Sequence, residues 1–304
     1  MTKHYKVETF DNNHVVYRMA KDNKPALTCH SGEIIEIHTL DCFSNKLLPE
    51  GSRLGVDTLP NNNPCTGPLY IGDAYPGDTL KIEILDIVVG NLGVNLIGPS
   101  EVHVDNRLES YEVKRIPIID GYAEVTPNLK LPVEPMIGVI GVSPKEGSLP
   151  TGLPGDHGGN MDCSQIKKGS TVYLPVFVEG ALLSIGDLHA LMGDGEIGGC
   201  GLEIEGKVVI QVTVVSDKTI PGPMVSIDDK WIIIASCNTL EEASVEATNR
   251  MLDLLIDFGG VNKEDASLIL NLSGHLKICQ LVNRLKTVRM ELSKECFIDK
   301  KLFK

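Results

Sequence analysis

The sequence predicts a mainly β fold of the sandwich or barrel type, followed by an α+β region at its C-terminal end. Most of the chain before Cys237 consists of short runs in which apolar and polar residues alternate, and the clearest are 33–37, 81–89, 207–215 and 230–235. Many of the 30 glycines and 17 prolines fall between these runs, where they favour turns. Short strands separated by frequent turns are typical of sandwiches and barrels, not of a parallel sheet with crossover helices.

The pattern changes to helical spacing near Cys237. Thr239 with Glu242 three residues later forms a capping box, and the helix that it starts should end at Gly259-Gly260. Asn262 is a second helix start, and residues 288–292 predict a closing strand. We therefore expect a β-rich body over residues 1–220, which carries the functional motifs, and an α+β tail over 221–304 that packs against it.

Composition excludes several classes of function. The 304 residues are 42% hydrophobic and 23% charged, as in an ordinary globular protein, and the formal net charge is −13. Such an acidic chain repels phosphate backbones and anionic lipid, so nucleic acid and membrane surfaces are not expected partners. None of the eight cysteines forms a CxxC pair and the first residues lack a signal-peptide pattern, so we expect reduced thiols and a cytoplasmic protein.

The densest group of polar residues lies in two glycine-rich segments, 154–162 and 186–196. The first contains Asp156, His157 and Asp162. In the second, Asp187 and His189 are two residues apart, so on a strand both side chains would point to one face. Asp194 and Glu196 repeat this spacing. An imidazole beside carboxylates suits a divalent cation such as zinc, and the glycines let the backbone come close to an ion or a substrate.

Simpler, non-catalytic interpretations exist for these residues and for two further candidates, Cys65 and Asp41. A lone Asp-x-His pair is usually a turn-capping carboxylate beside a solvated histidine. Cys65 is a candidate nucleophile, but a buried and inert thiol is the better interpretation because no local signature supports catalysis. Asp41 can either lend a carboxylate to the pocket or cap a loop.

Several stretches of the sequence resemble the acetamidase/formamidase family. They are Asp41-Cys-Phe-Ser-Asn45, Asn63-Pro-Cys-Thr-Gly-Pro-Leu-Tyr-Ile71, Ala74-Tyr-Pro-Gly-Asp78, Pro135-Met-Ile-Gly-Val-Ile-Gly-Val142, Gly155-Asp-His-Gly-Gly-Asn-Met-Asp162, Tyr173-Leu-Pro-Val-Phe-Val178 and Gly186-Asp-Leu-His-Ala-Leu-Met-Gly-Asp-Gly-Glu196. The resemblance implies jelly-roll-like and barrel-like β units, hydrolysis of short aliphatic amides, a bound divalent metal (zinc, with a possible additional calcium) and a homodimer or higher homo-oligomer. The sequence departs from the family pattern at Cys65, at Ser273-Gly-His275 and at Asn283.

These residues lead to a specific hypothesis for the site. The candidate metal ligands are His157, Asp162, Asp187, His189 and Asp194. Glu196 is the candidate general base, His157 a second catalytic candidate, and the amides of Gly158, Gly159 and Gly193 are candidates to hold the oxyanion. A zinc-type ion can lower the pKa of its water to about 7 and polarise a carbonyl group, which is what amide hydrolysis needs. A second, structural ion such as calcium is expected from the acidic loops.

Two other functions remain open at this stage. The chain can be a hydrolase of another carbon–nitrogen bond, such as that of a cyclic imide or a formylated amine. It can also be a non-enzymatic β protein in which metal-bridged loops hold a small ligand. The walls of the pocket would separate these alternatives, and the sequence does not identify them.

Overall fold

The computed structural model describes residues 3–9, 14–58, 61–99 and 109–297, and this part of the chain is mostly β-strand with two α-helices. The predicted mainly β fold is confirmed. Its largest sheet has nine strands among the described residues, in the order β1 (His4–Val7), β5 (Ile34–Thr39), β17 (Gly206–Val215), β7 (Thr79–Val89), β15 (Thr171–Pro175), β18 (Met224–Ile227), β19 (Lys230–Cys237), β21 (Lys286–Ser293) and β20 (His275–Gln280).

A second sheet lies against the first. In the described part of the chain it contains β14 (Gly158–Asn160), β12 (Met136–Gly141), β16 (Leu183–His189), β6 (Cys65–Ile71) and β2 (Val15–Val16), with β4 (Leu27–Cys29) also paired to β6. Strand β15 precedes β16 in the sequence, but the two do not pair with each other. Instead, β15 pairs with β7 and β18, whereas β16 pairs with β12 and β6, so the turn between them carries the chain from one sheet to the other.

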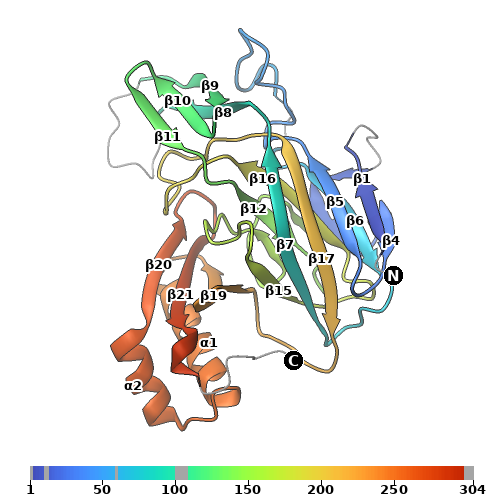
Figure 1. The fold of residues 1–304 in the computed structure, drawn as a ribbon, viewed down its shortest axis with the longest axis vertical. Coiled ribbons are helices and arrows are strands. Elements are labelled where there is room, and N and C mark those ends of the chain that lie inside the picture. Colours follow the sequence, from blue (N-terminus) through green and yellow to red (C-terminus); the bar gives the residue numbers. More distant parts are fainter. Residues whose placement is uncertain (1–2, 10–13, 59–60, 100–108, 298–304) are drawn as a thin grey trace.

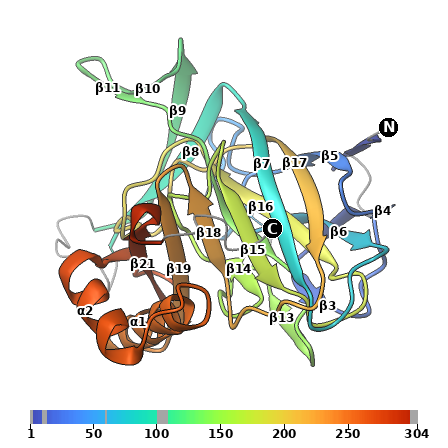
Figure 2. The ribbon, with the colours of Figure 1, turned by 60° about the horizontal axis from the view of Figure 1, so that its bottom comes forward.

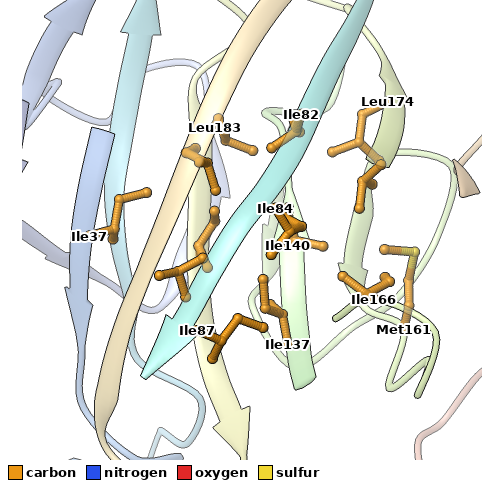
Figure 3. Close-up of a cluster of buried hydrophobic side chains, with 14 of the residues drawn as sticks. Ile37, Ile82, Ile84, Ile87, Ile137, Ile140, Met161, Ile166, Leu174 and Leu183 are labelled. Carbon is orange, nitrogen blue, oxygen red and sulfur yellow. The ribbon is translucent and has the colours of Figure 1, made fainter. Parts of the chain in front are cut away.

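The main core fills the space between these two sheets. Figure 3 shows Ile82 and Ile84 of β7 with Ile137 and Ile140 of β12, and all four are at most 1% exposed. Alternation along β7 explains the arrangement, because every second side chain points to the same face. Burying a side chain of this size contributes about 1.5–3 kcal/mol. The two sheets packed on this core therefore form a β sandwich, and loops lie at the ends of its strands.

The C-terminal strands extend the large sheet. Strand β18 pairs with β15, so hydrogen bonds run across residue 220, where the sequence suggested a change from body to tail. Helices α1 (Leu240–Asp257) and α2 (Lys263–Ser273) follow, and α1 packs on β19 and β21 (Figures 1 and 2). A short 3-10 helix (Lys294–Cys296) comes after β21.

Both helix starts were predicted correctly. The Thr239 hydroxyl accepts from the Glu242 amide at 3.1 Å, and the Asn262 side chain accepts from the Asp265 amide at 2.8 Å. Such caps satisfy backbone donors that the helix itself leaves free. The first helix ends before Gly260, whose φ of 67° needs glycine.

Two small sheets complete the fold. One consists of β11 (Leu129–Pro132), β10 (Tyr122–Thr126), β9 (Glu112–Ile119) and β8 (Leu92–Ile97), and projects from one end of the body (Figures 1 and 2). The other pairs β3 (Arg18–Ala20) with β13 (Ser148–Pro150). All eight cysteines are free thiols, as expected. Within the described residues, no helix combines the length and the apolarity needed to cross a membrane.

Candidate functional site

A buried group of three side chains that could hold a metal ion lies where the second sheet ends. Asp162 follows β14, His189 is the last residue of β16, and Glu196 is in the loop after it. Each offers a ligand atom, and these atoms all lie within 4.8 Å of one another. All three residues are at most 7% exposed. We call Asp162, His189 and Glu196 the first group.

A second group lies directly beside the first. It contains Cys42, Asp187 and Glu203, whose ligand atoms are also within 4.8 Å of one another. His189 Nε2 connects the two groups, since it is 3.2 Å from Glu203 Oε1 and 3.6 Å from Asp187 Oδ1. Glu203 and Cys42 were not predicted as site residues. Cys42 lies in the Asp41–Asn45 stretch that resembles the family, but only its neighbour Asp41 was a candidate, and Glu203 lies in none of these stretches. Only the folded chain brings Cys42 and Glu203 together.

A cavity of about 310 Å³ is lined by all three residues of the second group and by Glu196 of the first. Its walls contain Cys42, Phe43, Leu54, Asn62, Asn63, Leu96, Tyr111, Asn160, Asp187, Glu196, Gly198, Gly199, Cys200, Glu203 and Asn283. Among these described residues there is no lysine or arginine. Carboxylates, amide side chains and an apolar rim thus surround a space in which a small polar molecule can bind.

Strand pairing and one glycine bring the carboxylates together. Strands β12 and β16 run antiparallel, with Met136 opposite His189. Gly138 lies between the two groups on β12, and its carbonyl accepts from the Asp162 amide at 3.2 Å. A Cβ atom at Gly138 would be 2.6 Å from Asp162 Oδ1 and 2.7 Å from Asp187 Oδ2. Only glycine leaves room for both carboxylates.

Left-handed backbone is concentrated at the site. The φ angles are 57° at Asn63, 45° at Asp162, 55° at Asp187 and 46° at Glu196. Non-glycine residues rarely adopt this region, and holding one there costs about 1–3 kcal/mol. Such backbone is found mainly at functional sites, where the surrounding structure imposes it. Three of these four residues, Asp162, Asp187 and Glu196, carry acidic side chains of the two groups. The surrounding structure therefore fixes the backbone from which these side chains project.

Burial makes this set of carboxylates unfavourable without a cation. Burial and the nearby Asp187 raise the pKa of Asp162 to about 7. Burial also raises the pKa of Glu203 to about 8 and that of Glu196 well above its usual value. Burial lowers the pKa of His189, but the surrounding carboxylates Glu203 and Asp187 outweigh it and raise the pKa above its usual range. The surrounding carboxylates therefore favour the protonated form of the imidazole.

The free atoms of the site fit a divalent cation. Asp162 Oδ1, Glu196 Oε2 and Glu203 Oε2 are buried and have no hydrogen-bond partner among the described residues. A buried polar atom without a partner costs about 1–3 kcal/mol, and a charged one costs more. A cation that took these oxygens together with imidazole nitrogen would remove this cost, and zinc binds such a set readily.

Comparisons with known proteins show which sequences and structures this chain resembles. Residues 145–266 match the model of the Acetamidase/Formamidase family. The solved structure of an acetamidase from Bacillus halodurans is 41% identical, and the match covers 96% of this chain and 98% of that one with a TM-score of 0.91. The chain belongs to the acetamidase/formamidase family.

Two further relatives support the same assignment. A solved structure described as a predicted acetamidase/formamidase from Thermoanaerobacter tengcongensis is 40% identical, and the match covers 97% of each chain with a TM-score of 0.93. A formamidase from Methylophilus methylotrophus is 51% identical over 65 residues, which is 21% of this chain. The matched segments cover only 16–19% of the length of the curated relatives. The family resemblance that the sequence motifs predicted is confirmed.

The family motifs do not all contribute to the cavity. His157 is buried, but it belongs to neither group and does not line the cavity. Burial lowers its pKa to about 4. The neighbouring Gly158 amide donates to the Gly155 carbonyl at 3.0 Å, and Gly158 and Gly159 pair with β12. Gly193 is exposed. The structure thus unites Asp162, Asp187, His189 and Glu196, and it places His157 and these three glycines elsewhere.

Asn283, a departure from the family pattern, lies at the site. Its side-chain amide donates to Asp162 Oδ2 at 3.0 Å. The other departures lie away from the cavity: Cys65 is fully buried, and His275 is exposed on β20. Asp41 caps its loop, since Oδ1 accepts from the Phe43 amide at 2.9 Å and from the Asn45 amide at 2.6 Å.

Asp194, predicted as a ligand, is instead part of an ion pair. Its two oxygens accept from the Arg289 guanidinium at 2.8 and 2.6 Å. Burial disfavours ionisation of Asp194, but Arg289 and Ser164 outweigh it, so the pKa of Asp194 is lowered. A carboxyl group whose pKa is lowered in the folded state stabilises the fold above its unfolded pKa of about 3.9, and this stabilisation is lost as the pH falls through the folded value.

We therefore predict that Asp194→Asn lowers stability without loss of the site. The free energy of unfolding should fall by about 1 kcal/mol near neutral pH, because the pair is partly screened by solvent. The difference from the unchanged protein should shrink below pH 4, and the bound metal per chain should stay the same. Urea unfolding at several pH values and metal analysis would check this. Loss of the metal with unchanged stability would instead support Asp194 as a ligand.

Proposed function

We propose that this protein hydrolyses short linear amides such as formamide or acetamide to a carboxylate and ammonia, with a zinc-type cation held by the first group. The observation that carries the proposal is the meeting of Asp162, His189 and Glu196 beside a cavity with polar walls. Membership of the acetamidase/formamidase family supports the amide class. When bound, the cation would supply Lewis acidity toward the substrate carbonyl and a lowered pKa for water.

The asparagine side chains of the cavity can orient the substrate. Asn160 Oδ1 is buried without a partner among the described residues, so it can accept from the amide NH₂ of a substrate. Asn62 and Asn63 also line the space. Because an amide has both donors and an acceptor, such walls bind it with matched hydrogen bonds. They would leave unpaired polar groups against an apolar molecule.

Glu196 is assigned two roles. One oxygen would hold the cation, and the other would accept the proton of water and pass it to the leaving nitrogen. Its Oε2 atom has no hydrogen-bond partner among the described residues, so Oε2 is the oxygen that would hold the cation. Burial raises the pKa of Glu196, and a cation bound beside it would lower that pKa again, which would favour the ionised form that acts as a base.

The cavity volume favours one extension of the substrate range. The described residues enclose about 310 Å³, whereas a water molecule occupies about 30 Å³ in the liquid. Acetamide has four heavy atoms and fills a minor part of this space. Phe43, Leu54 and Leu96 add apolar surface. A larger amide, a cyclic imide or a formylated amine is therefore the second candidate substrate.

A screen of ammonia release tests the proposal. Purified protein is offered formamide, acetamide and larger primary amides, with ammonia as the readout. Succinimide is offered with ring opening as the readout, and a formylated amine with formate release as the readout. Each assay is run before chelation, after chelation and after zinc is restored. We expect turnover of at least one short primary amide, its loss with the chelator and its return with zinc. Turnover that survives removal of all metal would contradict the metal role, and absence of any amide turnover would contradict the proposed function.

We also propose a cytoplasmic homo-oligomer. Eight free thiols support a reducing compartment. Exposed apolar side chains on the small projecting sheet, including Ile119, Tyr122 and Leu129, support contact with another copy of the chain. Light scattering of the purified protein would give the number of subunits.

A further inference from the structure

The loop that carries Glu196 is attached to β20, which forms one edge of the large sheet in the described part of the chain. Gly195, the residue before Glu196, pairs with this strand. Its amide donates to the Cys279 carbonyl at 2.8 Å, and its carbonyl accepts from the Leu281 amide at 3.1 Å. Two backbone hydrogen bonds thus connect the proposed general base to the C-terminal part of the chain.

A buried arginine makes a second connection, one residue earlier in the loop. Arg289 of β21 is 1% exposed, and its guanidinium group donates to both oxygens of Asp194 at 2.8 and 2.6 Å. A contact of this kind between two planar groups fixes orientation as well as distance. The Ser164 hydroxyl also donates to Asp194 Oδ1, at 2.7 Å. The Asp194 side chain is therefore held from two sides.

The other side of Arg289 is held by its own strand. Its Nε atom donates to Glu291 Oε1 at 2.8 Å, and Glu291 is 2% exposed. Glu291 Oε2 lies 3.2 Å from Lys230 Nζ and 3.3 Å from Lys277 Nζ. A buried guanidinium group is unfavourable unless hydrogen-bonded carboxylates compensate its charge. Arg289 is therefore fixed in the sheet, and the loop is attached to it through Asp194.

The backbone at Glu196 needs such an attachment. The φ angle is 96° at Gly195 and 46° at Glu196. A residue with a side chain leaves this left-handed region unless the surrounding contacts hold it there. Because Asp194 is only two positions from Glu196, a shift of Asp194 moves the backbone from which the Glu196 carboxylate projects.

We propose that Arg289 is a positioning residue for amide hydrolysis, because it fixes through Asp194 the loop that places the Glu196 carboxylate. The inference rests on the proposed function, since it takes Glu196 as the general base. Arg289 neither lines the cavity nor belongs to the two groups of possible metal ligands. Its effect on the reaction therefore passes through the loop.

Two variants that each remove one negative charge beside Arg289 test the inference. Asp194→Asn breaks the link between Arg289 and the loop, whereas Glu291→Gln leaves that link intact. With zinc supplied in excess, we expect Asp194→Asn to lower kcat about tenfold at unchanged KM, because a displaced base weakens the transition state and not the binding of substrate. Glu291→Gln should keep kcat, although it should destabilise the protein at least as much. Urea unfolding of both variants gives this comparison of stability.

Amide hydrogen exchange gives a second readout that does not depend on turnover. Exchange reports local opening, so a loop that has lost its anchor exchanges faster than the rest of the protein. A peptide that spans residues 191–201 should exchange faster in Asp194→Asn than in the unchanged protein. In Glu291→Gln its exchange should stay as it is. A purely structural effect of the ion pairs would instead change both variants alike.

The outcomes separate this inference from the proposed function. If the unchanged protein releases ammonia and the two variants have equal kcat values, the positioning role of Arg289 is overturned and the hydrolysis stands. Equal exchange of the loop in the two variants would also overturn it. If the unchanged protein releases ammonia from no amide, the proposed function fails and the catalytic part of the inference fails with it. Faster loop exchange in Asp194→Asn alone would in that case still support Arg289 as the anchor of the loop.

Discussion

Replacing His189 with alanine should abolish cation binding at the first group and lower amide turnover about a thousandfold. The residue is fully buried and offers the only nitrogen ligand among the two described groups. Loss of the Lewis acid removes several kcal/mol of transition-state stabilisation, and about 4 kcal/mol corresponds to a factor of a thousand. Metal analysis and the rate of ammonia release, measured on the same preparation, would check both effects.

Two other histidines provide the comparison. His275 is exposed on β20, so His275→Ala should leave the metal content, the rate and the stability unchanged. His157 is buried but belongs to neither group. His157→Ala should therefore lower stability and keep the bound metal. If His157→Ala lost the metal and His189→Ala kept it, the ligand set proposed from the structure would be wrong.

Local patterns predicted much of the secondary structure. The runs at 81–89, 207–215 and 230–235 are strands β7, β17 and β19, because alternation of side chains describes a half-buried strand directly. The caps at Thr239 and Asn262 depend on residues three positions apart. Patterns with such short range are present in the sequence itself. The assignment of β15 and β16 to different sheets does not follow from such local patterns, because it depends on strand partners far along the chain.

The same distinction between short-range patterns and long-range contacts explains which site residues could be predicted from the sequence. Asp187 and His189 were predicted together because two positions separate them, and the structure places their side chains 3.6 Å apart. Glu203 joins them through backbone pairing with β8, and a lone glutamate between leucine and isoleucine gives no sign of burial. Asp194 has the spacing of a ligand but meets Arg289, 95 positions away. Sequence spacing predicts which side chains lie on the same face of a strand. It does not predict which residues from distant parts of the chain contact that face.

The second prediction with a large expected effect concerns a substitution at Gly138. This substitution distinguishes a structural from a catalytic role of the Asp162 and Asp187 carboxylates. Gly138→Ala would place a methyl group 2.6 Å from Asp162 Oδ1 and 2.7 Å from Asp187 Oδ2. Both oxygens would have to move by several tenths of an ångström or more. Displacement of catalytic groups by about 1 Å can cost about 100-fold in rate. We expect turnover to fall by about that factor and cation affinity to fall with it.

The stability of this variant should change much less than its activity. Overpacking of a core costs about 1–3 kcal/mol, and moving two carboxylates apart relieves part of their repulsion. Gly90→Ala is the matched control, because a Cβ there meets Glu205 only at the ordinary contact distances of 3.5–3.8 Å. It should leave both turnover and unfolding unchanged. A folded Gly138→Ala protein with full turnover and full metal content would show that the Asp162 and Asp187 oxygens need not lie where the structure places them, and the cation would then have to bind elsewhere.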